Sequence, residues 1–109
     1  MSLSERTAEI QRTFTNRGLK VLGAVWASRR AIDFALRGPT SENSVVRCTN
    51  SPLKADSLEL KTMLAEGDFT RAFIVYTAED QPHLSGEIET YPLSRIDELA
   101  ALLAKESAP

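Results

Sequence analysis

Residues 31–49 constrain the fold of this chain more than any other segment. Apolar side chains recur at every second position in residues 31–36 and 44–49, and a period of two is typical of β-strands. Between them, residues 38–43 read Gly-Pro-Thr-Ser-Glu-Asn, which is turn chemistry. The segment therefore predicts two strands around a turn. Asp33 lies in the middle of the first strand, and Arg47 and Thr49 lie two residues apart on the second.

The remaining elements are predicted from periodicity and capping residues. Residues 4–17 have the apolar spacing of a helix that Gly18 ends, and residues 19–26 read as a strand that is apolar, and therefore buried, on both faces. Asp56 and Glu59 have the spacing of a capping box for a second helix over residues 57–66. Three further elements are predicted: a central strand at 71–77, a short edge strand at 87–91, and a last helix after residue 94.

This order of elements, αβββαβ(β)α, predicts an α/β fold with a mixed sheet of four to five strands flanked by helices. The connection from the third strand through the second helix to the fourth strand is a crossover, which predicts that these two strands are parallel. With 109 residues, the chain is expected to form a single domain over 1–109.

Charge and composition exclude some function classes. The formal net charge is −2, so binding to nucleic acid would need a local basic patch. Arg29, Arg30, Arg37 and Lys54 are the candidates for such a patch, and the alternative is that mixed surface charges only keep the domain soluble. No apolar run approaches the ~18 residues of a membrane span, and no signal-peptide pattern precedes the first helix. We expect no membrane partner and a cytoplasmic location.

Five short segments resemble the restriction-endonuclease-like nucleases of the PD-(D/E)xK type, in particular the Mrr-like branch. They are residues 18–21, 31–36, 45–49, 73–77 and 96–103, and the resemblance lies in their order and spacing. It implies a restriction-endonuclease-like domain in which an Asp and a second acid hold Mg²⁺, the metal activates water, and a lysine beside it offsets negative charge.

The resemblance also implies that the catalytic site of this chain is degenerate. Asp33 matches the metal-binding Asp, but Arg47 stands where the second acid is expected and Thr49 where the lysine is expected. A guanidinium beside Asp33 would repel Mg²⁺ and pair with the carboxylate instead. We therefore expect no cofactor, with Mg²⁺ bound at Asp33 only if activity persists.

Three functions follow as alternatives. The first is a non-catalytic domain that binds DNA or a partner in a DNA-processing system. The second is an active Mg²⁺-dependent deoxyribonuclease in which Asp33 works with relocated acids. The third is a protein-interaction or regulatory module, which could form a dimer through an exposed sheet edge near residues 87–91.

The candidates for relocated acids are Glu5 and Glu9 on the first helix and Asp56 and Glu59 on the second. The simpler interpretation is that these are capping acids and a solvated helix face.

The remaining reactive or aromatic side chains favour structural roles. Cys48 is the single cysteine, so it forms no internal disulfide, and the strand pattern predicts that it points into the core. His83 is the only histidine and makes no metal site or catalytic triad by itself. Trp26 and Phe34 are predicted to be core residues rather than platforms for stacked bases.

Overall fold

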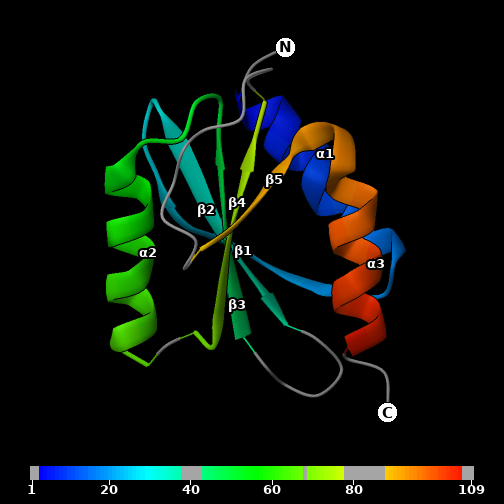
Figure 1. The fold of residues 1–109 in the computed structure, drawn as a ribbon. Helices are drawn as coiled ribbons and strands as arrows, with labels where there is room; N and C mark the ends of the chain where they lie inside the picture. The colour runs from blue at the N-terminus through cyan, green and yellow to red at the C-terminus, as the bar shows by residue number, and fades with distance from the viewer. Residues whose placement is uncertain (1–2, 38–42, 68, 78–87, 107–109) are drawn as a thin grey trace.

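The computed structural model describes residues 3–37, 43–67, 69–77 and 88–106, and its described part has an α/β fold in three layers. A mixed sheet of five strands separates two helices on one face from one helix on the other (Figure 1). Within the described residues the elements are α1 (Leu3–Asn16), β1 (Lys20–Ala27), β2 (Ala31–Arg37), β3 (Asn43–Thr49), α2 (Lys54–Ala65), β4 (Arg71–Tyr76), β5 (Glu89–Pro92), the 3₁₀ turn η1 (Leu93–Arg95) and α3 (Ile96–Glu106).

The strands lie side by side in chain order, β1-β2-β3-β4-β5. The pairs β1–β2 and β2–β3 are antiparallel, whereas β3–β4 and β4–β5 are parallel. Both the strand pair of residues 31–49 and the parallel crossover through α2 are thereby confirmed. In the β2–β3 register Asp33 lies opposite Arg47, so the two side chains project from the same face of the sheet.

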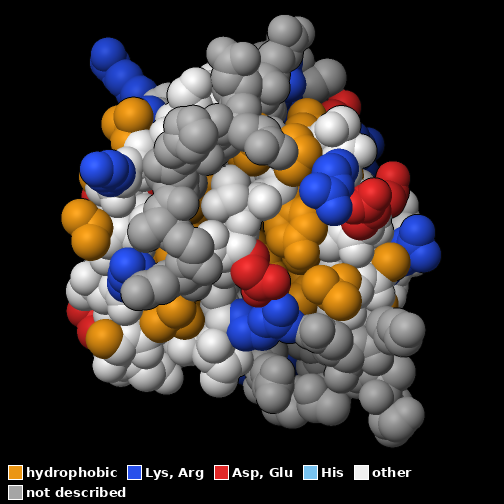
Figure 2. All heavy atoms as spheres, viewed as in Figure 1, with side chains coloured by type: hydrophobic (Ala, Val, Ile, Leu, Met, Phe, Trp, Pro, Cys, Tyr) orange, Lys and Arg blue, Asp and Glu red, His pale blue; other side chains and the backbone are white. Residues whose placement is uncertain are grey.

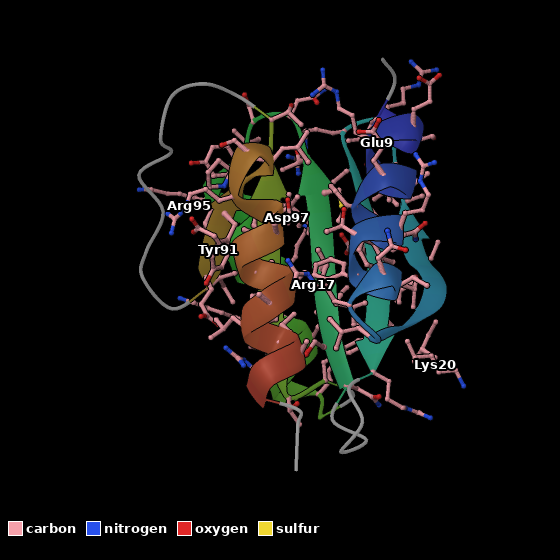
Figure 3. All side chains as sticks on the ribbon, turned by 90° about the vertical axis from the view of Figure 1, so that its right-hand side faces the viewer. Glu9, Arg17, Lys20, Tyr91, Arg95 and Asp97 are labelled. Atoms are coloured by element: carbon pink, nitrogen blue, oxygen red, sulfur yellow. The ribbon has the colours of Figure 1, made fainter. Side chains whose placement is uncertain are left out.

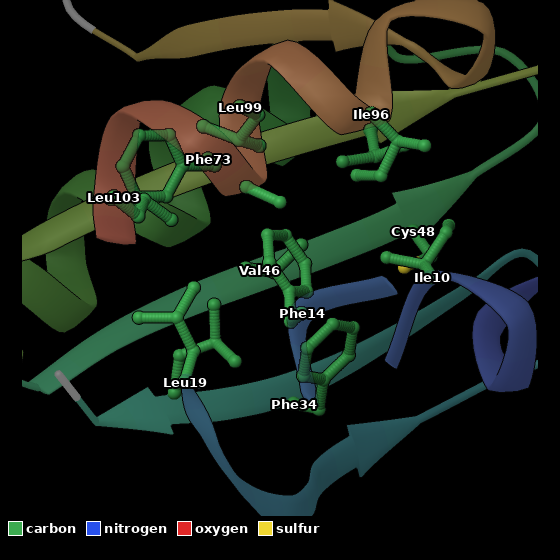
Figure 4. Packing of buried hydrophobic residues seen from close by; sticks show 13 residues of the cluster. Ile10, Phe14, Leu19, Phe34, Val46, Cys48, Phe73, Ile96, Leu99 and Leu103 are labelled. Carbon is green, nitrogen blue, oxygen red and sulfur yellow. The ribbon is translucent and has the colours of Figure 1, made fainter. Parts of the chain in front are cut away.

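The larger apolar core lies between the sheet and the pair α1 and α3, which cover the same face (Figures 3 and 4). Ile10 and Phe14 of α1 are buried there, as the helical spacing predicts. Alternate residues of the central strands supply the other side of this core. They are Phe34, Leu36, Val46, Cys48, Phe73 and Val75.

The opposite face of the sheet is only partly apolar. Under α2, Val45, Ile74 and Leu60 form a second, smaller core with Ala72 and Ile88. Beside it on the same face the strands present Asp33 and Arg47, both buried. Helix α2 therefore covers both an apolar region and a charged region of this face of the sheet. None of the described helices has the length and apolarity needed to cross a bilayer.

Strand β1 is not buried on both faces, so that prediction is wrong. Most of its residues are exposed, and the Trp26 side chain is 42% exposed rather than part of the core. The physical reason is position: β1 is an outer strand, and its pairing with β2 shifts register between Val21 and Gly23 and again between Ala24 and Trp26. Apolar residues on both faces of a strand are typical of an interior strand, but here they lie at a sheet edge.

Helix α2 begins at Lys54, three residues before the predicted start. Asp56 therefore lies in the first turn, where its Oδ2 accepts a hydrogen bond from the Leu53 N–H at 2.7 Å. The predicted capping box of Asp56 with Glu59 is therefore wrong: the N-cap residue is Leu53, and Asp56 lies at the third position of the helix, where its side chain caps the Leu53 backbone. Leu60 lies four residues later on the same buried side of the helix.

Gly18 ends α1 in the left-handed region, with φ of 85°. No atom lies within 4 Å of the place that a Cβ would occupy, so a larger residue would be opposed only by backbone strain. We expect Gly18→Ala to lower the free energy of unfolding by about 1–2 kcal/mol. Urea denaturation measures this, and an unchanged stability would contradict it.

Candidate functional site

A buried arginine on β3 organises the charged region under α2. Arg47 is 1% exposed and Asp33 on β2 is fully buried. Arg47 Nε donates to Asp33 Oδ1 at 2.7 Å, and Nη2 donates to Oδ2 at 2.8 Å. This two-bond pairing uses both carboxylate oxygens. The sequence-based expectation that a guanidinium beside Asp33 pairs with it is confirmed.

Two carboxylates from α2 complete the shell around the same guanidinium. Arg47 Nη1 donates to Asp56 Oδ1 at 2.9 Å and to Glu59 Oε2 at 2.5 Å. Asp56 is fully buried, whereas the Glu59 side chain is 50% exposed. We call Asp33, Arg47, Asp56 and Glu59, with Arg30 described next, the arginine–carboxylate cluster.

Arg30 binds Asp56 from the turn between β1 and β2. Its Nη1 donates to Oδ2 at 2.9 Å and its Nη2 to Oδ1 at 2.6 Å, and the Arg30 side chain is 41% exposed. Thr49 is buried and its hydroxyl donates to the Arg30 carbonyl oxygen at 3.0 Å. Thr49 therefore supports the turn that carries Arg30 and makes no bond to the carboxylates.

The electrostatics of the cluster favour the charged forms of Asp56 and Arg47. Burial by itself would raise the pKa of Asp56, but hydrogen bonds from Arg30, the Leu53 N–H and Arg47 outweigh it and hold this pKa below its ordinary value of 3.8. Burial likewise opposes the charge on Arg47, yet its carboxylate partners raise the pKa on balance. With two arginines and three carboxylates, the cluster carries a formal net charge of minus one.

This arrangement does not fit Mg²⁺. The ion would need carboxylate oxygens and water around it, but both oxygens of Asp33 accept hydrogen bonds from Arg47. The guanidinium also engages Asp56 and Glu59, so it occupies the space on which the three acids converge. Among the described residues, no group of three or more His, Cys, Asp or Glu side chains is arranged to hold a metal ion.

The sequence offers Asp56 and Glu59 as relocated acids, with capping acids and a solvated helix face as the simpler interpretation. For Asp56 the solvated face is wrong, because the side chain is buried against the sheet. The signal that could have found it is the spacing to Leu60: four residues separate them, so both project from one side of a helix that starts at Lys54. Glu5 and Glu9 lie on α1, across the sheet from α2, and line a separate depression beside Val21.

The basic residues proposed to contact phosphate do not form one patch. Arg29 and Lys54 are exposed near Arg30, at one end of the sheet. Arg37 lies at the other end of β2, opposite Lys20, and donates to Asn43 at 3.2 Å. On the face that Figure 2 shows, the Lys and Arg side chains are scattered, and at the centre and on the right they lie beside Asp and Glu.

A groove borders the cluster on the side of β1. It has a volume of about 400 Å³ and is lined by Trp26, Arg47, Glu59, Thr62, Met63 and Glu66. The guanidinium carbon of Arg47 lies 5.1 Å from the centre of the Trp26 ring, a cation–π contact. The groove therefore joins an exposed aromatic residue to the buried charges.

Cys48 is buried on the α1 side of β3, as predicted. Burial raises the pKa of its thiol to about 12, so the thiolate is scarce at neutral pH. We expect a disulfide reagent such as DTNB to leave Cys48 unmodified in the folded protein and to modify it fully in urea. Rapid modification without denaturant would contradict the burial. His83 lies outside the described residues.

The comparisons with known proteins found no match: no family model fits the chain, and no curated protein and no solved structure matches it significantly.

Proposed function

We propose that this chain is a non-catalytic binding domain on a restriction-endonuclease-like scaffold, acting in a DNA-processing system. One observation carries the proposal. The Arg47 guanidinium donates hydrogen bonds to the Asp33 carboxylate and to the two carboxylates of α2 that converge on it, those of Asp56 and Glu59. A divalent ion and an activated water have no open position there. The α/β order of elements and the place of Asp33 opposite Arg47 support the likeness to that scaffold.

The partner that we favour is a protein. Leu22, Val25 and Trp26 of β1 are each more than 40% exposed, and they lie on an outer strand. Exposed apolar side chains gathered at one edge are typical of protein-interaction surfaces. DNA is the second candidate, because Arg29 and Lys54 are exposed at one end of the sheet and could contact phosphates.

The experiment has two arms. Supercoiled plasmid is incubated with the protein in Mg²⁺ or Mn²⁺, and we expect no nicking beyond that of Asp33→Ala. Nicking that Asp33→Ala abolishes would overturn the non-catalytic proposal and favour the relocated-acid nuclease. In the second arm, a mobility-shift assay over a salt series tests DNA. Salt-sensitive binding that Arg29→Glu and Lys54→Glu abolish would favour DNA as the partner.

A further inference from the structure

Within the part of the chain that the structure describes, the outer edge of β1 is open and largely apolar. Among the described residues, β1 pairs only with β2. Its seven residues from Val21 to Ala27 include no charged side chain. Outer strands usually carry charges that prevent association. In β1 the only charged residue is Lys20 at its start, so the uncharged remainder, which exposes Leu22 and Trp26, indicates an interaction surface.

The groove beside this edge is acidic where it meets solvent. Glu59 and Glu66 are exposed and lie on the rim, on the last two turns of α2 and just after it. Glu66 makes no ion pair within the described residues, and Glu59 shares the guanidinium of Arg47 with two other acids. Since the cluster already has one excess negative charge, Arg47 does not neutralise the rim. A cation is therefore the complementary ligand.

The Trp26 ring adds a second preference for a cation. It already holds one guanidinium, that of Arg47, at cation–π distance, yet 42% of the side chain remains exposed. Tryptophan is the aromatic residue that binds cations best through its ring face. An aromatic wall with carboxylates nearby is suited to the long, partly apolar side chain of arginine or lysine.

We propose that this groove binds an arginine or lysine side chain from a basic segment of a partner protein, with Leu22 and Val25 contacting apolar residues of the same segment. This inference rests on the proposed function and names the chemistry of its partner.

Other occupants fit less well. Phosphate groups of DNA would meet Glu59 and Glu66, and like charges repel. A second copy of the chain would pair through β1, but the two register shifts in that strand oppose regular edge-to-edge pairing. A basic side chain entering the groove requires no such pairing.

Trp26 is the only tryptophan of the chain, so its fluorescence reports directly on the groove. The probes are two short peptides at low salt, one with alternating valine and arginine and one with glutamate in place of arginine. We expect the arginine peptide to change the Trp26 emission and to bind at least about tenfold more tightly than the glutamate peptide.

Two charge reversals identify the site. Glu66→Lys should weaken the arginine peptide by about tenfold or more. Asp97→Lys is the matched control: it changes the net charge equally but lies exposed on α3, across the sheet (Figure 3), and should leave binding within about twofold.

Equal binding of the two peptides, no binding of either, or equal losses in both variants would overturn the inference. So would an emission change caused by an oligonucleotide instead of the arginine peptide. If the Trp26 emission changed with protein concentration alone and the mass in solution doubled, the groove would instead be an interface between two copies of this chain. The plasmid assay is independent of these results, so the non-catalytic proposal can stand while the groove proposal fails.

Discussion

Arg47→Ala is expected to lower the free energy of unfolding by about 3–5 kcal/mol. The reason is that Asp33 is fully buried and both of its side-chain hydrogen bonds come from this guanidinium, so its charge would be left without a partner. The buried Asp56 would keep only one of its two arginine partners, Arg30. Urea denaturation at pH 7 measures the change. Arg37→Ala is the matched control, because Arg37 is exposed and, within the described residues, its side chain bonds to Asn43 alone. It should change stability by less than about 0.5 kcal/mol.

The same variant should acquire a response to divalent cations. In Arg47→Ala, Asp33, Asp56 and Glu59 would surround a space that the guanidinium has left, and three carboxylates are a suitable ligand set for Mg²⁺ or Mn²⁺. We expect Mn²⁺ to raise the melting temperature of Arg47→Ala and to leave that of the natural protein unchanged. Equal effects of Mn²⁺ on both proteins would contradict this prediction.

The second large expected effect is a loss of folding stability at acid pH, caused by protonation of Asp56. Because its pKa in the folded protein lies below the ordinary value of 3.8, the stabilising contribution of Asp56 is complete above the unfolded pKa. It is lost as the pH falls through the folded pKa. The natural protein should therefore lose stability steeply below about pH 4.

The variant Asp56→Asn distinguishes the contribution of the Asp56 carboxylate to this pH dependence from the contributions of the other acids. At pH 7 it removes the charge that Arg30 and Arg47 share, and we expect a loss of about 3–5 kcal/mol. Its stability should fall less between pH 5 and pH 3 than that of the natural protein, as urea midpoints at the two pH values would show. Asp97→Asn, at an exposed position, should keep the natural slope, and an equal slope in Asp56→Asn would contradict the assignment.

The sequence predicts the inner part of this fold well because local pattern and burial agree there. Alternation in residues 31–36 and 44–49 predicts both strands and the opposition of Asp33 and Arg47, and the apolar run at 71–77 predicts β4 as an inner strand. The helical spacing of Ile10 and Phe14 likewise predicts which side of α1 is buried. Each of these signals depends on nearest neighbours along the chain.

The outer strand and the cluster depend on tertiary placement, which no local pattern encodes. The apolar residues of β1 are the same whether the strand is central or outer, so its exposure follows only from the strand order. The spacing of Asp56 predicts a capping acid, although not its place at the third position of the helix. Its bonds to Arg30 and Arg47 join segments 26 and 9 residues away. The groove at Trp26 depends on the place of the outer strand and on that of the cluster, because it forms where β1 meets α2.

The most direct test of the account is anomalous diffraction from crystals of the natural protein grown with Mn²⁺. We propose that the Arg47 guanidinium occupies the position that a catalytic cation would require. We therefore expect no manganese peak within coordination distance of Asp33, with both Arg47–Asp33 hydrogen bonds retained. A manganese ion bound by Asp33 together with Asp56 or Glu59, with Arg47 displaced, would contradict it.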